Sequence, residues 1–189
     1  MTEPGLTEKA KMLAGELYRG NDPELTAERA RAKKLCAEYN LSAGNLNRAV
    51  LQDLLGCETD VYFEPPFFCD YGHNLRLGRN VYANHNLVIL DCAIVTLGDD
   101  VQIAPNVLIS TAGHPVDPEV RRSGLEFAHP ITIGNNVWLG AGVLVMPGVT
   151  IGENTTVGAG SVVTRSMPAN CLAFGNPCRV VRDLPGTAT

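Results

Sequence analysis

The chain has 189 residues, enough for one domain with its own core and a small appendage. Hydrophobic residues make up 45% of it, which is ordinary for a globular protein. The formal net charge is -5, which argues against a nucleic-acid partner. The first twenty residues lack an apolar core of signal-peptide length, and no apolar run approaches the roughly 18 residues of a membrane span, so we expect a soluble cytoplasmic protein with no membrane partner.

The first 56 residues have a helical pattern, and we expect them to form a helical cap. Apolar residues recur at helical spacing in the first part, at Leu6, Ala10, Leu13 and Leu17. Asp22 followed by Pro23 is typical of a helix start, and the stretch 24–39 continues with an apolar stripe at Leu25, Ala32, Leu35 and Tyr39. A third helix is expected over 45–55, with Gly56 just past its end.

From Leu77 onward the chain repeats itself every six residues. In the block ITIGNNVWLGAGVLVMPGVTIGENTTVGAGSVVT an aliphatic residue recurs at Ile133, Leu139, Val145, Ile151, Val157 and Val163. A small or β-branched residue follows four places on, at Val137, Val143, Val149, Thr155 and Ser161. The same spacing joins Leu77, Ala83 and Ile89, and again Leu97, Ile103 and Ile109. This period predicts a solenoid of short strands with one inward aliphatic residue per sextet.

Two interruptions break the repeat. Two extra residues separate Ile89 from Leu97, and the pattern is lost between Ile109 and Ile133. The lost stretch, STAGHPVDPEVRRSGLEFAHP, is expected to leave the solenoid as a loop spanning 110–132. The predicted organisation is therefore a helical cap, 1–56, followed by a solenoid domain, 57–189, that carries the loop.

The hexapeptide rule is that of the left-handed parallel β-helix, and the sequence resembles the maltose and galactoside O-acetyltransferases over nearly its whole length. The stretch LTEKAKMLAGELYRGNDPEL resembles the helical cap of that family. Closer still are the motifs EPPFFCDYGHN, NVYANHNLVILD, VTLGDDVQIAPNV, STAGHP, PITIGNNVWLGAGV and GNPCRVVR. The resemblance implies a mainly β fold, namely a left-handed parallel β-helix with an N-terminal helical cap and an ejected loop.

The same resemblance implies a homotrimer with active sites between neighbouring helices. It also implies acetyl-CoA as co-substrate, a sugar acceptor, and direct transfer without a covalent acetyl-enzyme. The six cysteines fit this expectation as reduced, mostly buried thiols, because none of their spacings indicates a disulfide framework or a zinc site.

Acyl transfer to a hydroxyl needs a base and a donor for the developing oxyanion. His114 is the candidate base, since Gly113 frees the turn before it and Pro115 favours an extended backbone, and it matches the catalytic histidine of the family in STAGHP. Asn84 matches a functional asparagine of the family. The alternatives are a loop histidine with one hydrogen bond and a turn asparagine. No metal is expected, because the spacing of the histidines differs from that of metal-dependent enzymes of this fold.

Several residues are candidates for the acceptor. Tyr82 aligns with a sugar-contacting position of the family, and Trp138 offers an outward stacking face. The candidate hydrogen-bonding carboxylates are Asp70, Asp91 and Glu126. Solvated carboxylates, and trimer packing for the tryptophan, are the alternatives. The galactoside enzymes carry an aspartate soon after the pair that Leu17-Tyr18 matches; here the first acid is Asp22, which also suits a helix cap.

The C-terminal part is expected to hold coenzyme A. Small residues leave backbone groups open to the pantetheine amides, at Ala141, Gly142, Ala159 and Gly160. Candidates for the phosphates are Thr164, Arg165, Arg179 and Arg182, because a guanidinium matches phosphate geometry. Solvated arginines are the alternative.

Two other functions stay open at this stage. One is acetyl transfer to a non-sugar acceptor such as a xenobiotic or serine, and the other is a non-catalytic trimeric binding scaffold.

Overall fold

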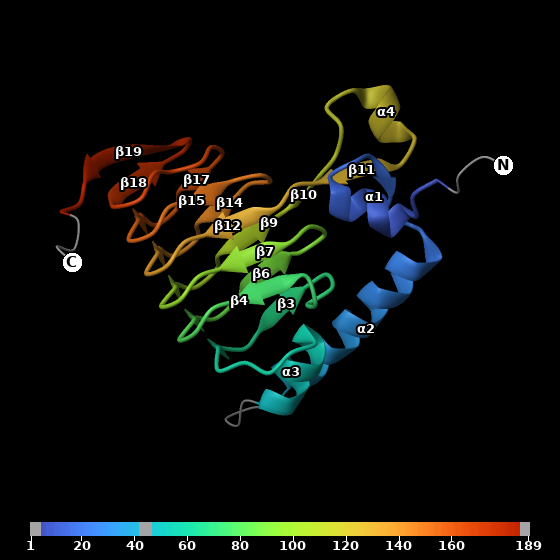
Figure 1. Cartoon of the computed structure of the whole chain (residues 1–189), viewed down its shortest axis with the longest axis horizontal. Helices are drawn as coiled ribbons and strands as arrows, with labels where there is room; N and C mark the ends of the chain where they lie inside the picture. The colour runs from blue at the N-terminus through green and yellow to red at the C-terminus, as the bar shows by residue number, and fades with distance from the viewer. Residues whose placement is uncertain (1–4, 42–46, 186–189) are drawn as a thin grey trace.

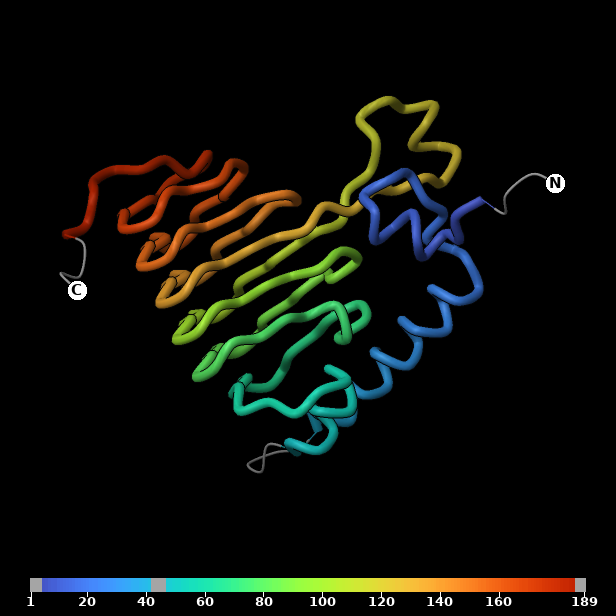
Figure 2. The backbone as a smooth tube through the Cα atoms, in the orientation of Figure 1, coloured from blue at the N-terminus to red at the C-terminus, as the bar shows by residue number. Residues whose placement is uncertain are grey.

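The six-residue repeat folds into a β-helix with three faces. The computed structural model describes residues 5–41 and 47–185, and its coils stack along one axis, with the cap running along one side of them (Figures 1 and 2). Face 1 consists of β2 (Tyr62–Phe63), β5 (Tyr82–Ala83), β8 (Gln102–Ile103), β13 (Trp138–Leu139), β16 (Thr156–Val157) and β18 (Cys171–Gly175). Face 2 consists of β3 (Phe67–Cys69), β6 (Leu87–Leu90), β9 (Leu108–Ser110), β14 (Leu144–Val145) and β17 (Val162–Val163). Face 3 consists of β4 (Leu75–Leu77), β7 (Val95–Leu97), β12 (Ile131–Ile133) and β15 (Thr150–Ile151).

Neighbouring strands on each face are parallel and in register, so equivalent residues of successive coils stack. The inward aliphatic residues of the regular block are fully buried, as predicted, at Ile133, Leu139, Val145, Ile151, Val157 and Val163. β19 (Cys178–Asp183) turns back antiparallel to β18 and closes the C-terminal end. The predicted β-helix is therefore confirmed, and each fully buried aliphatic side chain contributes roughly 1.5–3 kcal/mol to its stability.

Two of the three corners of the β-helix are regular. Corner 3, between faces 3 and 1, places Asn80, Asp100, Asn136, Asn154 and Asn170 at positive φ. Their side chains form a ladder of hydrogen bonds, such as that from Asn136 Nδ2 to Asn154 Oδ1 at 3.0 Å. Corner 1, between faces 1 and 2, uses Asn86, Asn106, Gly142 and Gly160 in the same way. Asparagine and glycine are the residues that tolerate this backbone, which explains their recurrence.

Corner 2, between faces 2 and 3, carries both interruptions of the repeat. The longer one leaves the solenoid after Ser110 and returns at Ile131, slightly inside the predicted limits. It is an ordered hairpin, made of β10 (Ala112–Gly113), α4 (Pro118–Arg122) and β11 (Leu125–Ala128). The cap strand β1 (Tyr18–Arg19) pairs with the other edge of β11, so the cap and the loop form one small antiparallel sheet.

Two of the three predicted cap helices follow the sequence pattern. α2 (Pro23–Asn40) begins at Asp22, whose carboxylate accepts from the backbone N–H of Glu24 and Leu25, and its predicted stripe is buried. α3 (Arg48–Leu55) ends at Gly56, which has φ +70°; the first predicted residues of this helix lie outside the described residues. α2 runs along the coils to α3, which lies at the N-terminal end of the β-helix (Figure 1).

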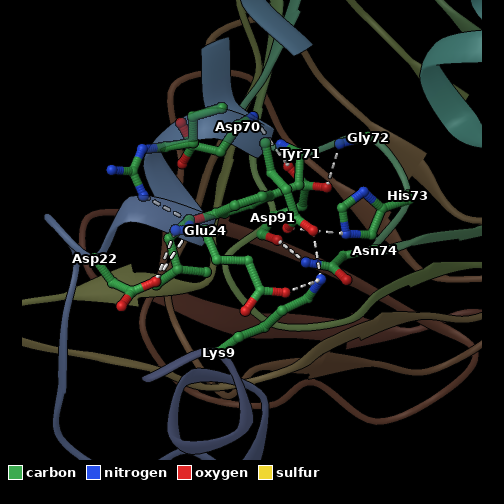
Figure 3. A network of polar contacts seen from close by, with 12 residues as sticks. Lys9, Asp22, Glu24, Asp70, Tyr71, Gly72, His73, Asn74 and Asp91 are labelled. Atoms are coloured by element: carbon green, nitrogen blue, oxygen red, sulfur yellow. Dashed lines mark hydrogen bonds and ion pairs between the residues drawn. The ribbon is translucent and has the colours of Figure 1, made fainter. Parts of the chain in front are cut away.

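The predicted apolar stripe of the first helix is wrong. α1 (Glu8–Ala14) is short, because Gly15 ends it at φ +77°, and Leu6 and Leu17 lie outside it. Leu13 is 43% exposed, whereas Met12 is fully buried in a cluster with Tyr18, Tyr71 and Ala128. The buried side is set by the loop and corner 2, which the local sequence pattern does not contain. Lys9 ties α1 to α2 through ion pairs with Glu24 and Glu28 (Figure 3).

Candidate active site

The floor of the enlarged corner is built around Asp91. Its Oδ1 accepts from the backbone N–H of Asp70 at 3.0 Å and of Tyr71 at 2.9 Å, and its Oδ2 accepts from Gly72 at 2.7 Å (Figure 3). The residue is fully buried, and burial raises the pKa of its carboxyl to about 6 against the lowering effect of these N–H groups. The predicted contact with a sugar is therefore wrong for Asp91, which holds the corner together instead.

A half-buried polar cluster lies between this floor, the cap and the loop. Burial raises the pKa of Asp70, whose Oδ2 is 3.5 Å from the Cys92 thiol. Arg29 of α2 donates to the Tyr71 hydroxyl at 2.7 Å and also to the backbone carbonyl of Gly20. The guanidinium of Arg29 is thus engaged on both sides, and its positive charge opposes the rise in the pKa of Asp70.

Glu126 reaches the same cluster from the loop. It pairs with Tyr18 across β1 and β11, and the Tyr18 hydroxyl donates to Glu126 Oε2 at 3.2 Å. A Cβ at Gly20 would lie 2.7 Å from Glu126 Oε1. Gly20 therefore leaves the space that the Glu126 carboxylate fills, whereas both hydrogen bonds accepted by Asp22 cap α2.

His114 follows directly on β10 and is exposed. The register of the hairpin ends at the pair of Gly113 with Phe127, and His114 and Glu126 are the residues next to that pair on the two strands. Gly113 does not serve the turn as expected; a Cβ there would lie 2.5 Å from the Phe127 ring, so the glycine permits close packing. In the part of the chain that the structure describes, no hydrogen bond or ion pair engages the His114 ring, which is free to contact a substrate.

Asn84 lies at corner 1, at the opposite edge of face 2 from the loop. Its Oδ1 accepts from the backbone N–H of His85 at 2.7 Å, which leaves its amide N–H₂ to donate outward. The equivalent positions of later coils carry Ala104, Gly140 and Gly158. Within one chain, Asn84 and His114 therefore lie at opposite edges of face 2. The two side chains could meet only if a second copy of the chain contributed one of them.

The predicted coenzyme residues lie in three places at the C-terminal end. Corner 1 carries Ala141, Gly142, Ala159 and Gly160, and a Cβ on either glycine would meet no atom within 4 Å. Thr164 and Arg165 are exposed in corner 2, whereas Arg179 and Arg182 are exposed on β19. The two glycines have φ +68° and +69°, so the backbone conformation alone accounts for glycine at these positions. The space beside them is nevertheless open.

Face 1 presents an outward column of side chains that includes Tyr82 and Trp138. From the first coil upward the column reads Tyr62, Tyr82, Gln102 and Trp138. Trp138 is 52% exposed, as predicted for an outward residue. Tyr62, and Glu64 beside it, are additional site candidates that sequence reasoning missed. The signal was present, because Tyr62, Phe63 and Glu64 precede Tyr82, Ala83 and Asn84 by one coil in the same register.

Other kinds of site find no support among residues 5–41 and 47–185. Within them no three His, Cys, Asp or Glu side chains are grouped so that they could hold a metal ion. No helix among them is long and apolar enough to cross a membrane. A groove of about 660 Å³ at the end of α3, lined by Leu55, His73 and Leu77, includes none of the predicted site residues.

The cap, the six-residue solenoid and the ejected hairpin with its exposed histidine define a hexapeptide-repeat acetyltransferase. Residues 11–57 match the maltose acetyltransferase hexapeptide capping motif, and residues 130–165 match the bacterial transferase hexapeptide, which comprises six repeats. This chain belongs to the family of the maltose and galactoside O-acetyltransferases, as the following relatives show.

The chain is 44% identical to the galactoside O-acetyltransferase of Escherichia coli, over 95% of this chain and 89% of that one. It is 47% identical to nodulation protein L of Rhizobium leguminosarum, over 92% and 94%. The crystal structure of a maltose O-acetyltransferase from Clostridium difficile superimposes with a TM-score of 0.93 at 43% identity, covering 96% of this chain and 99% of that one. A galactoside acetyltransferase in complex with coenzyme A superimposes with a TM-score of 0.87 at 41% identity, covering 95% and 92%.

Proposed function

We propose that this acetyltransferase transfers the acetyl group of acetyl-CoA to a hydroxyl of a sugar, with His114 as the general base. The observation that carries the proposal is the exposed, unengaged imidazole on an ordered hairpin, next to the polar cluster of Asp70 and Glu126. The names of the relatives, maltose and galactoside acetyltransferase, support a sugar acceptor. The cytoplasmic location stays a prediction from the sequence.

The chemistry follows from the roles of two side chains. His114 takes the proton of the acceptor hydroxyl while the hydroxyl oxygen attacks the thioester carbonyl. The amide of Asn84 donates to the oxyanion that develops on that carbonyl. As the intermediate collapses, the carbon–sulfur bond breaks and the imidazolium returns its proton to the coenzyme A thiolate. Acetyl sugar and coenzyme A are the products, and no acetyl-enzyme forms.

A homotrimer would bring these side chains together, and the outward rows of the β-helix support it. Face 2 presents an apolar row, formed by Phe68, Val88, Leu108, Leu144 and Val162. Face 3 presents a polar row, formed by Arg76, Thr96, Thr132 and Thr150. A row of apolar side chains that is unbroken by a polar residue is typical of a surface that packs against another copy, whereas the column of face 1 is interrupted by Gln102. Because face 2 lies between Asn84 and the loop, a copy docked there would complete the site.

A single charged substitution should disrupt the proposed interface on face 2. Leu108→Asp places a carboxylate on the outward row of face 2, where the side chain is only half-buried, so the fold should persist while the trimer dissociates. Light scattering after gel filtration should show a monomer with little activity. Thr132→Asp, on the outward row of face 3, is the matched control and should stay trimeric. A trimeric Leu108→Asp protein would rule out face 2 as the interface.

Coenzyme A is placed at the C-terminal half of corner 1. Along this corner the side chains change from Glu64 and Asn84 in the first coils to Ala104, Gly140 and Gly158 further on. The small residues open the backbone to the pantetheine amides, and Arg179 and Arg182 offer guanidinium groups to the phosphates. Related structures contain coenzyme A or acetyl-CoA, which supports coenzyme A as the ligand.

Replacement of the base tests the proposal. His114→Ala should lower kcat about 10²–10⁴-fold, the usual cost of removing a general base, and leave the melting temperature unchanged because the side chain is exposed. Thiol release from acetyl-CoA with a panel of sugars measures the rate. Arg122→Ala is the loop control, since Arg122 pairs with Glu119 of the same helix on the surface of the loop. A His114→Ala enzyme with near-wild-type kcat would refute the assignment.

The two other functions predict different results. A scaffold would show no thermal shift with coenzyme A and no thiol release with any acceptor. An enzyme for xenobiotics or serine would release thiol with those acceptors and not with sugars.

A further inference from the structure

We propose that the acceptor site extends onto the first coil of face 1, where Tyr62 and Glu64 bind a second sugar unit of the acceptor. The inference rests on the proposed function and deepens it, because it assigns oligosaccharides rather than monosaccharides as the preferred acceptors. The surface concerned consists of Tyr62, Glu64, Tyr82 and Asn84, and we call it the tyrosine platform.

The platform is a consequence of strand register. β2 and β5 are parallel neighbours, and Tyr62 pairs with Tyr82. The two rings stack, with centroids 5.9 Å apart and planes 17° from parallel. Both stay accessible, at 39% and 37% exposure. Because stacked rings cover part of each other's faces, the exposed parts of the two rings form one continuous apolar strip, along which the C–H groups of a pyranose ring can lie.

Polar groups border the rings on one side. Glu64 continues the strand after Phe63, and its backbone N–H donates to the carbonyl of Ala83 at 2.8 Å, which sets it beside Asn84. Tyr62 and Glu64 are two residues apart on either side of the buried Phe63, so both side chains lie on the outward side of the strand. Partial burial, and then the charge of Glu64, raises the pKa of the Tyr62 phenol. A carboxylate that accepts and an amide that donates are the partners that sugar hydroxyls need.

The spacing also suits a chain of sugars. Adjacent parallel strands lie about 4.8 Å apart, close to the length of one sugar unit, so successive units would fall on successive coils. The unit that is acetylated lies at Tyr82 and Asn84, beside the proposed oxyanion donor. The next unit then lies at Tyr62 and Glu64. In the opposite direction the column continues with Gln102 and Ala104, which offer neither a ring nor a carboxylate.

The platform ends at Tyr62. β2 is the last strand of face 1 at this end, and Leu51 and Arg48 of α3 border a small cavity of about 80 Å³ beside the Tyr62 ring. The stacked surface therefore accommodates one unit beyond the acetylated one. We expect a disaccharide to gain over a monosaccharide, and a trisaccharide to gain little over a disaccharide.

Matched acceptor pairs test this directly. The trimeric enzyme is assayed by thiol release with glucose, maltose and maltotriose, with galactose and lactose, and with N-acetylglucosamine and N,N′-diacetylchitobiose. In the series with the highest rate, the wild-type kcat/KM should be about two- to tenfold higher for the disaccharide than for the monosaccharide, the range expected for one stacked ring. Tyr62→Ala should abolish this gain, so that the ratio of the two kcat/KM values falls close to one.

Further variants separate binding from structure. Tyr62→Phe should keep most of the gain because the ring remains, and Glu64→Gln should lose part of it. Tyr62→Thr replaces Tyr62→Ala if the alanine variant is unstable, since a β-branched residue suits the strand. Arg76→Ala changes an outward residue of the same coil on face 3 and should leave the ratio of the two rates unchanged.

Two results would overturn the inference and leave the proposed function intact. One is a wild-type enzyme that uses monosaccharides as well as disaccharides in every series. The other is a Tyr62→Ala enzyme that keeps the disaccharide gain or loses both rates equally. Failure of the wild-type enzyme to acetylate any of these sugars would instead refute the sugar-transferase proposal itself, and the inference with it.

Discussion

Corners 2 and 3 of the β-helix perform the same turn by different means. Corner 3 repeats one solution, an asparagine or aspartate at positive φ, and most of these side chains bond to the equivalent residue of the neighbouring coil. Corner 2 has no such ladder in the first three coils. There the chain inserts extra residues, buries the carboxylate of Asp91, and ejects the hairpin that carries His114 and Glu126.

Corner 3 belongs to the scaffold, whereas corner 2 carries the candidate site. A repeated corner gives every coil the same surface, and such a surface offers no place for a unique arrangement of groups. Insertions at one corner let the cap, the floor and the loop converge, and the half-buried cluster of Asp70, Arg29 and Glu126 results. Departures from the repeat therefore indicate where to look for chemistry in a solenoid of this kind.

The largest expected effect is at the irregular corner. Asp91→Ala leaves three buried backbone N–H groups, those of Asp70, Tyr71 and Gly72, without their acceptor. At roughly 1–3 kcal/mol for each unpaired group, the free energy of unfolding should fall by about 3 kcal/mol or more. Urea denaturation measures the loss. Thr96→Ala, in the outward row of face 3 in the same coil, is the control. An Asp91→Ala protein as stable as the control would show that the corner does not depend on this carboxylate.

A smaller effect is expected at the regular corner. Asn136 has φ +54°, a conformation that costs an ordinary residue about 1–2 kcal/mol. Asn136→Ala should therefore lower the free energy of unfolding by about that amount. Asn136→Gly should lower it by less, because glycine adopts this backbone freely. If alanine and glycine prove equally costly, the side-chain ladder rather than the backbone conformation determines the residue at this corner.

Much of the scaffold could be predicted because its determinants are local in sequence. The six-residue spacing from Ile133 to Val163 specified which side chains are buried, and Asp22 specified the start of α2. The loop was recognised as an interruption. Its hairpin was not, since the pairing of β11 with β1 joins residues far apart in the chain. The stripe assigned to the first helix failed for the same reason, because Met12 is buried by contacts that the loop and corner 2 supply.

The site was harder to predict than the fold. The exposure of His114 follows from its place in the loop, but Asp91 looked like a ligand because it interrupts the repeat, and its burial becomes visible only when the coils stack. Glu64 and Tyr62 were missed since they precede the first clear sextet. Within one chain Asn84 and His114 lie at opposite edges of face 2, so the proposed meeting of the two requires a second copy, which no pattern within one chain specifies.

The smallest expected effect concerns Cys92, the thiol nearest the polar cluster. A covalent route would need a thiolate, and burial together with the charge of Asp70 raises the pKa of Cys92 to about 12, so the thiol is neutral at physiological pH. Cys92→Ala should leave kcat within about twofold of the wild-type value, far less than the loss expected for a general base.

Direct transfer also requires both substrates to be bound together, so initial-rate lines against acetyl-CoA at several sugar concentrations should intersect. Parallel lines, or an acetyl group trapped on Cys92, would contradict direct transfer while leaving the fold and the two corners as they are.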